Sequence, residues 1–243
     1  MSSIEELIQA RGWSDEEARL RSSICEIGRL CYSRNYIVGA DGNISGRLAD
    51  GTILITPAGA MKGFLAPEQI AHVDMQGRTV DNGPKASTEV GIHLVCYAER
   101  ADVRAVLHCH PPHAVAMTIA GFDMQCPVIP EIIVTIGGIP TAPFGTPGTP
   151  ELAASIQNIV RCSDTVVMQN HGSVTIGPNL LDAYKKLDML EHTAKILWIA
   201  SCIGTVKPLD PEYVAKLLGT REKLGIRTLN TLENQCGRGG ASR

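Results

Sequence analysis

Two histidines separated by a single residue are the most chemically informative feature of this sequence. His108 and His110 close an apolar run that is typical of a β-strand. Residues two apart in a strand point to the same face, so we expect both imidazoles to project side by side while Cys109 points away. Two ring nitrogens at this spacing can share one metal ion at about 2.0–2.1 Å each. A Pro-Pro pair follows at once, which places the histidines at the end of the strand.

A third histidine lies in a comparable position further along the chain. His171 stands where another apolar run meets a glycine turn, in the segment Gln169–Gly172. Three histidines at strand ends favour a metal site more strongly than the pair alone, whose alternative is two structural histidines. The role of His113 stays open, because this histidine is close in sequence to the pair. The remaining three have structural or surface positions as their simplest explanation: His72, His93 and His192.

Three short segments offer hydroxyl groups, amides and backbone N–H groups that suit an anion. Ser87 and Thr88 open a predicted helix, and free N–H groups at a helix N-terminus bind phosphate. An ordinary helix cap is the alternative for these two residues. Glu89 is either a first-turn acid favoured by the helix dipole or an oxygen ligand and base. The other two segments, Gly42–Ser45 and Thr56–Gly59, are also compatible with ordinary loops.

The elements that position these groups follow from apolar periodicity and capping residues. Helices are predicted from Ser14 to about Arg34, from Ser87 or Thr88 to about Arg100, from Thr149, from Leu180 to Ile203, and from Asp210 to about Leu224. Strands are predicted at 51–56, 71–75, 103–110 and 164–169, and residues 39–46 are typical of a turn. Because strands and helices alternate irregularly, we predict an α/β sandwich around one mixed or antiparallel sheet.

The composition is that of a globular chain. Hydrophobic residues make up 44% and charged residues 19% of the 243 residues, and the formal net charge is −3. Binding to nucleic acid or to anionic membranes needs Lys and Arg residues in clusters, and the sequence contains no such cluster. No signal-like or membrane-spanning segment stands out. Eight cysteines without a C-x-x-C pair favour reduced, buried thiols in a cytoplasmic protein. We predict one domain over 1–243, with a core from about 14 to 224 and a flexible tail at 234–243.

Together these blocks resemble the class II aldolase/adducin family over about residues 20–205. The matching blocks, in the family's order, are Gly42–Ser45, Thr56–Gly59, Ser87–Glu89, His108–His110, Phe144–Thr149 and Gln169–Gly172. The resemblance implies that His108, His110 and His171 bind Zn²⁺, for which Mn²⁺, Co²⁺ or Fe²⁺ are alternatives. It implies that Glu89 is the fourth ligand at rest and the acid/base residue. It also implies a set of residues that hold a substrate phosphate: Gly42, Asn43, Ser45, Thr56, Gly59, Ser87 and Thr88.

The resemblance further implies a fold, an assembly and a reaction. The fold is a three-layer αβα sandwich around a central, mostly antiparallel mixed sheet, in a homotetramer with active sites between subunits. The reaction is cleavage of a ketose 1-phosphate to dihydroxyacetone phosphate and an aldehyde through an enediolate. The family's tyrosines on the aldehyde side are missing, both in Pro130–Thr135 and at about Leu224. The identity of the aldehyde product therefore stays open.

Three other functions within the same family are weighed against the aldolase. The first alternative is a metal-dependent decarboxylase of a sugar-acid phosphate or a related acid. A pentulose-phosphate 4-epimerase ranks lower because that relative usually has Asp at the position of Glu89. A non-catalytic adducin-like binding module also ranks lower because the three histidines and this acid are intact.

Overall fold

The structure is a computed structural model that describes residues 4–226. The described residues form two compact units, which comprise 4–110 with 176–184 and 111–175 with 185–226. The tail predicted at 234–243 lies outside the described residues. The single domain predicted from the sequence stays a prediction.

Seven strands form one mixed sheet in the order β3-β2-β1-β4-β7-β6-β5. The strands are β1 (Asn43–Arg47), β2 (Ile53–Ile55), β3 (Ala71–Val73), β4 (Ala105–Cys109), β5 (Thr141–Ala142), β6 (Thr165–Met168) and β7 (Gly172–Gly177). Strand β1 pairs antiparallel with β2 and β4, β2 with β3, and β6 with β7, whereas β5 and β6 are parallel. Together with the helices that flank it, this sheet confirms the predicted fold class.

Helix α2 (Asp15–Ser33) covers one face of the sheet in the first unit. It begins as predicted, because the Ser14 hydroxyl accepts a hydrogen bond from the Glu17 N–H at 3.1 Å. It packs on β1 and β2, and its Leu20 side chain lies over Gly46 of β1. Helix α1 (Ile4–Arg11) and two short 3₁₀ turns, η1 (Lys62–Phe64) and η2 (Pro67–Gln69), surround α2.

Helix α3 (Val90–Glu99) lies on the opposite face of β1. Adjacent strand residues point to opposite faces, so Ser45 points away from the face that carries Gly46. The Ser45 hydroxyl lies 2.7 Å from the Tyr97 hydroxyl of α3. The polar side chains of β1 therefore face α3, which also follows directly after Glu89.

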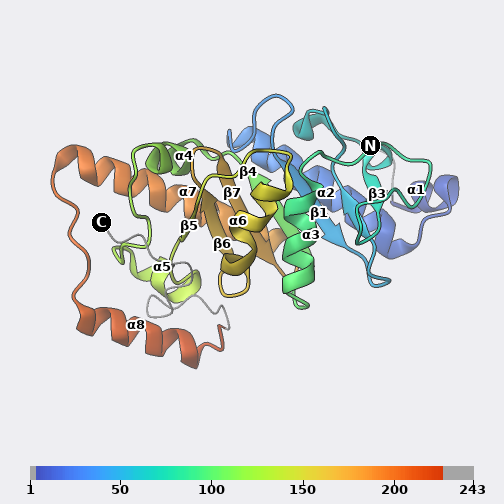
Figure 1. Cartoon of the computed structure of the whole chain (residues 1–243). Coiled ribbons are helices and arrows are strands. Elements are labelled where there is room, and N and C mark those ends of the chain that lie inside the picture. Colours follow the sequence, from blue (N-terminus) through green and yellow to red (C-terminus); the bar gives the residue numbers. More distant parts are fainter. Residues whose placement is uncertain (1–3, 227–243) are drawn as a thin grey trace. The chain divides into compact units, whose positions relative to one another are not determined.

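The second unit contains α4 (Pro112–Ile119), α5 (Pro130–Thr135), α6 (Pro150–Val160), α8 (Pro211–Lys223) and most of α7 (Leu180–Ile203). Val167 of β6 packs into a cluster with Met117 of α4 and with Leu190 and Leu197 of α7. Helix α6 packs on β5 and β6 (Figure 1). No helix in residues 4–226 combines the length and the apolar character needed to cross a membrane.

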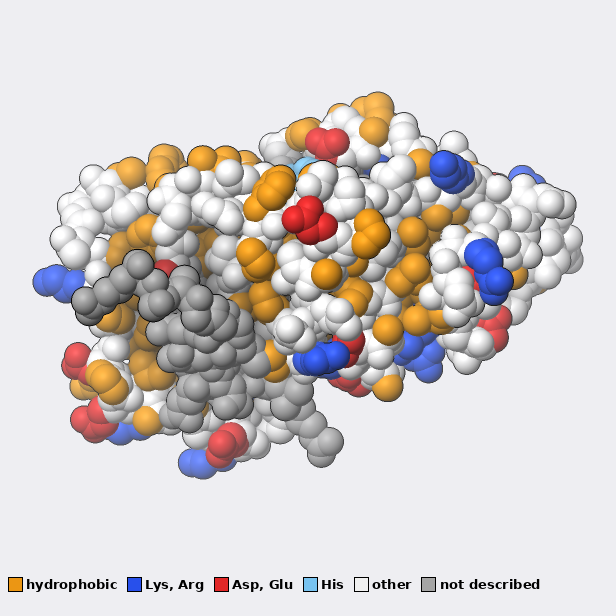
Figure 2. Space-filling model, in the orientation of Figure 1, with side chains coloured by type: hydrophobic (Ala, Val, Ile, Leu, Met, Phe, Trp, Pro, Cys, Tyr) orange, Lys and Arg blue, Asp and Glu red, His pale blue; other side chains and the backbone are white. Residues whose placement is uncertain are grey.

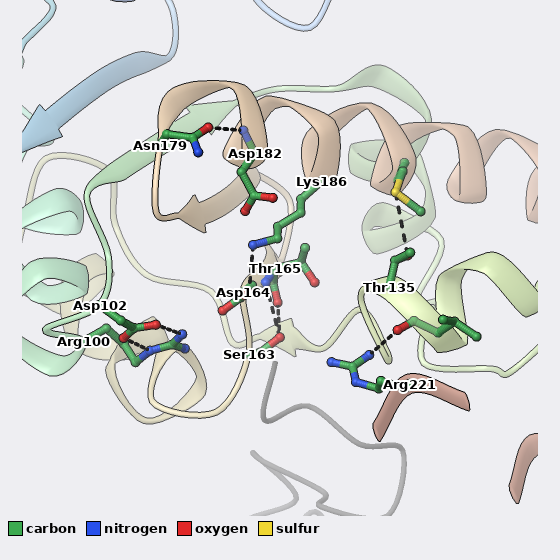
Figure 3. A network of polar contacts seen from close by, with 12 residues as sticks. Arg100, Asp102, Thr135, Ser163, Asp164, Thr165, Asn179, Asp182, Lys186 and Arg221 are labelled. Atoms are coloured by element: carbon green, nitrogen blue, oxygen red, sulfur yellow. Dashed lines mark hydrogen bonds and ion pairs between the residues drawn. The ribbon is translucent and has the colours of Figure 1, made fainter. Parts of the chain in front are cut away.

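Buried charged groups fix the helices of the second unit. Figure 3 shows the Lys186 ammonium reaching the Asp164 carboxylate at 2.8 Å. Arg221 of α8 donates to the backbone carbonyl of Ile133 in α5 at 3.1 Å. Each buried charge thus has a partner, as its desolvation requires. Helix α8 is therefore tied to α5 by a hydrogen bond as well as by packing.

Two of the predicted element boundaries are wrong. Residues 43–46 belong to β1 and not to a turn, because burial between α2 and α3 selects small and polar side chains that lack the usual strand pattern. Helix α3 begins at Val90, so Ser87 and Thr88 are not its cap. The Ser87 N–H donates to the carbonyl of Thr56 at 3.3 Å, which holds this segment extended beyond the end of β2.

The cysteines follow the prediction only in part. Cys25, Cys31, Cys96 and Cys109 are free and buried, as expected for reduced thiols. Cys202 is free but exposed, so the prediction of buried thiols is wrong there.

Candidate metal centre and its acid

The two histidines predicted to share a metal lie at the end of β4. His108 is opposite Asn43 of β1 in the strand register, and His110 follows the strand. Their Nε2 atoms lie 3.0 Å apart, with the ring planes inclined by 65°. Two nitrogens that bind one tetrahedral ion at about 2.0–2.1 Å are separated by about 3.3 Å. The observed spacing therefore fits two imidazoles that present the same ring atom to one cation.

Acidic side chains lie beside both imidazoles. The Oε2 atom of Glu89 is 3.4 Å from Nε2 of His108, which is fully buried. The Oδ2 atom of Asp41 is 3.8 Å from Nδ1 of His110. A carboxylate on the Nδ1 side favours the tautomer that keeps its proton there, which leaves the Nε2 lone pair for a metal.

His171 lies in the tight turn between β6 and β7. Asn170 before it has a positive φ of 56°, a left-handed conformation that asparagine tolerates better than most residues. His171 belongs to the second unit, and its predicted part in a metal site with His108 and His110 stays a prediction. Three neutral imidazole donors of this kind suit zinc and related divalent ions, so the donor set fits the cofactor expected from the sequence.

Glu89, the predicted acid, is held by an amide. The Asn43 Nδ2 donates to Glu89 Oε2 at 2.9 Å, and the asparagine side chain is 1% exposed. Asn43 was predicted to hold a phosphate, yet here it contacts the residue predicted to transfer the proton. Phosphate binding by Asn43 stays a prediction.

His93 is the residue of this region that sequence reasoning missed. Its Nε2 lies 2.5 Å from Asn43 Oδ1, and its Nδ1 lies 2.6 Å from the Ser45 hydroxyl. Burial lowers the pKa of His93 to about 3, so its ring is neutral at ordinary pH. The available signal in the sequence was its position four residues after Glu89, which places both side chains on one helical face.

The residues predicted to bind phosphate differ in exposure. Asn43, Ser45, Thr56 and Ser87 are buried, and Gly42 is buried with a φ of 68°, whereas Gly59 and Thr88 are exposed. Two of the hydroxyls accept backbone hydrogen bonds: Thr56 from the Ile44 N–H at 3.2 Å and Ser87 from the Glu89 N–H at 3.3 Å. Phosphate binding by this set stays a prediction, and the exposed Thr88 is its most accessible hydroxyl.

Replacing Thr88 with alanine is expected to raise KM for a phosphorylated substrate by about tenfold or more, because a hydrogen bond to a charged group is lost. The kcat should stay within a few-fold of its original value. Steady-state kinetics on the phosphorylated substrate and on its unphosphorylated analogue measure this effect. Thr220→Ala, at an exposed position on α8, is the matched control. An equal KM increase for both substrates would remove Thr88 from the phosphate site.

The comparisons with known proteins agree with one another. Residues 22–198, which contain every candidate site residue, match the model of the class II aldolase and adducin N-terminal domain. The chain is 37% identical over 187 residues to 3-oxo-tetronate 4-phosphate decarboxylase of Cupriavidus necator, covering 75% of this chain and 85% of that protein. It is 33% identical over 175 residues to L-fuculose phosphate aldolase of Methanococcus maripaludis, covering 72% of this chain and 93% of that protein.

A solved structure supports the same relationship. The fold is similar to that of an L-fuculose 1-phosphate aldolase, with a TM-score of 0.77 at 25% identity, covering 85% of this chain and 96% of the other. This similarity agrees with the mixed sheet and flanking helices described above.

Proposed function

Because the chain belongs to the class II aldolase and adducin family, we propose that it is a metal-dependent lyase that decarboxylates a phosphorylated sugar acid. The proposal rests on one observation in the first unit. Two imidazoles at the end of β4 present their Nε2 atoms 3.0 Å apart, and the Glu89 carboxylate lies 3.4 Å from one of them. A pair of imidazole donors beside an acid suits a reaction that combines charge stabilisation with proton transfer.

The relatives favour decarboxylation over the aldol cleavage that the sequence ranked first. The decarboxylase of C. necator is 37% identical to this chain and the M. maripaludis aldolase 33%. The two reactions are chemically close. In a 3-oxo-tetronate 4-phosphate the ketone is β to the carboxylate, and loss of carbon dioxide gives the same enediolate as cleavage of a ketose 1-phosphate.

The missing tyrosines also favour decarboxylation. Aldol cleavage turns a substrate hydroxyl into an aldehyde, so a base must remove the hydroxyl proton. Carbon dioxide leaves without such a proton, and no base is needed on that side of the substrate. Helix α5 (Pro130–Thr135) contains no tyrosine, which is compatible with this simpler requirement. Cleavage of a ketose 1-phosphate remains the second candidate, supported by the aldolase relatives.

The residues of this chain have separate roles in the proposed reaction. His108, His110 and His171 would hold the ion, for which we propose zinc, and a bound divalent ion would supply Lewis-acid polarisation of the substrate ketone. When carbon dioxide leaves, its bonding electron pair moves into the adjacent ketone. Glu89 takes up a proton from the solvent and delivers it to the carbon that lost the carboxylate, which yields dihydroxyacetone phosphate. Thr88 is proposed to bind the phosphate.

The assembly and location stay proposals as well. A homotetramer with sites between subunits is supported by hydrophobic side chains that remain exposed on α7, including Trp198, Ile199 and Ile203. Figure 2 shows hydrophobic side chains gathered over α4 and α7. Exposed apolar patches of this kind are common at protein interfaces. A cytoplasmic location is proposed from the metabolic substrate class.

A product assay tests the proposed function. The zinc-reconstituted protein is supplied with 3-oxo-tetronate 4-phosphate or with L-fuculose 1-phosphate, and carbon dioxide and aldehyde are measured separately, because both reactions yield dihydroxyacetone phosphate. We expect carbon dioxide from the first substrate and little aldehyde from the second. Chelator-treated protein is the control and should be inactive. Release of aldehyde without carbon dioxide would refute the proposed decarboxylation and support aldol cleavage instead.

A further inference from the structure

We propose that His93 is a positioning residue that fixes the Glu89 carboxylate through the side chain of Asn43. This inference rests on the proposed role of Glu89 in proton transfer. His93 lies in α3, and Asn43 lies in β1. The three side chains belong to the first unit, and none of the relationships used here involves the second.

The contacts form one continuous buried chain of hydrogen bonds. Tyr97 OH lies 2.7 Å from Ser45 Oγ, which lies 2.6 Å from His93 Nδ1. His93 Nε2 lies 2.5 Å from Asn43 Oδ1, and Asn43 Nδ2 lies 2.9 Å from Glu89 Oε2. The side chains of His93 and Ser45 are 0% exposed, Asn43 1% and Tyr97 2%. Water therefore does not replace any of these partners.

The donors and acceptors along the chain fix the position of each proton in it. The Asn43 Nδ2 donates to Glu89 Oε2, so the Asn43 Oδ1 faces His93. An amide oxygen only accepts, so His93 must carry its proton on Nε2. Its Nδ1 then accepts from the Ser45 hydroxyl, which accepts in turn from Tyr97. A single tautomer of His93 satisfies all of these requirements.

This arrangement explains why a histidine occupies a fully buried position. An apolar side chain there would leave the Asn43 carbonyl without a donor, and a buried unsatisfied group is costly. The amide would then be free to rotate and would no longer keep Oε2 of Glu89 beside His108. Glu89 Oε2 lies 3.4 Å from His108 Nε2. Misplacement of a reacting group by about 1 Å can cost about 100-fold in rate.

Two substitutions of the same residue separate positioning from packing. His93→Gln can keep an N–H near the position of Nε2, whereas His93→Asn is too short and loses it. We expect His93→Asn to lower kcat by between about 10-fold and 100-fold with KM within about twofold and metal content unchanged. His93→Gln should recover most of the rate. Cys96→Ala, at a fully buried position in the same helix, is the matched control for packing and should leave kcat unchanged.

A double-mutant cycle with Glu89→Gln tests whether the effect passes through the acid. Once Glu89 no longer transfers a proton, His93→Asn should reduce kcat no further. A full additional loss in that background, or equal losses for His93→Asn and His93→Gln, would overturn the inference. If His93→Asn does not fold, Ser45→Ala tests the far end of the chain and should lower kcat several-fold, and an unchanged kcat would count against the inference.

The failure of this inference is distinguishable from failure of the proposed function. If Glu89→Gln turns over as fast as the original protein, the role of Glu89 is wrong, and the inference is overturned with it. If Glu89→Gln is slow and His93→Asn keeps its full rate, only the positioning role of His93 is refuted.

Discussion

Replacing His108 with alanine is expected to abolish both metal binding and turnover. The imidazole is fully buried, and its Nε2 lies 3.0 Å from that of His110, so no other donor can enter its place without moving the strand. Loss of a partner that merely orients a ligand costs about 10–100-fold in metal affinity. Loss of the ligand itself should cost more than that. Metal content after dialysis and single-turnover rates measure the two effects.

His192→Ala is the matched control for this experiment, because His192 is exposed on α7. It should bind metal and turn over like the original chain. His110→Ala should behave like His108→Ala. If either variant of the β4 pair keeps a full equivalent of metal and its activity, the assignment of the metal site is wrong.

Glu89→Gln is expected to retain the metal and to lose about 10²- to 10⁴-fold in kcat. The amide has nearly the same shape as the carboxylate, and its oxygen can still accept the hydrogen bond that Asn43 Nδ2 makes with Oε2 at 2.9 Å. It cannot take up or deliver a proton. The substrate should therefore bind with nearly unchanged KM, while the proton transfer fails.

Steady-state kinetics combined with metal analysis separate the two roles predicted for this residue. Glu26→Gln, at an exposed position on α2, is the control and should change neither kcat nor metal content. A Glu89→Gln variant with ordinary kcat would remove Glu89 as the acid/base residue. A variant that loses its metal would instead indicate that Glu89 acts mainly as a ligand.

The parts of the fold that could be predicted are those with a strong local pattern. Helix α7 spans Leu180–Ile203 as predicted, because an apolar stripe recurs along its whole length. Strand β4 and the same-face projection of His108 and His110 follow from the two-residue period of a strand. By contrast, the sequence predicts a turn where β1 lies, because its asparagine, serine and glycine are residues that loops also favour.

The site was harder to predict wherever a side chain's partner is distant in sequence. His93 and Asn43 are 50 positions apart, and their contact depends on how α3 lies over β1. The sequence gives no measure of that packing. Ser45 has the composition of an anion-binding residue, yet the pleat of β1 directs its hydroxyl into the interior, between His93 and Tyr97. Aldol cleavage and decarboxylation share one enediolate, so the residues that stabilise it do not distinguish the two reactions.

The most direct test of the central claim is the position of the ion itself. Crystals of the zinc-reconstituted protein, measured at the zinc absorption edge, yield an anomalous difference map that locates the metal without reference to activity. We predict one peak per chain at about 2.0–2.1 Å from a ring nitrogen of His108, His110 and His171. A peak held by other side chains, or zinc-loaded protein with no peak between these three rings, would contradict the account.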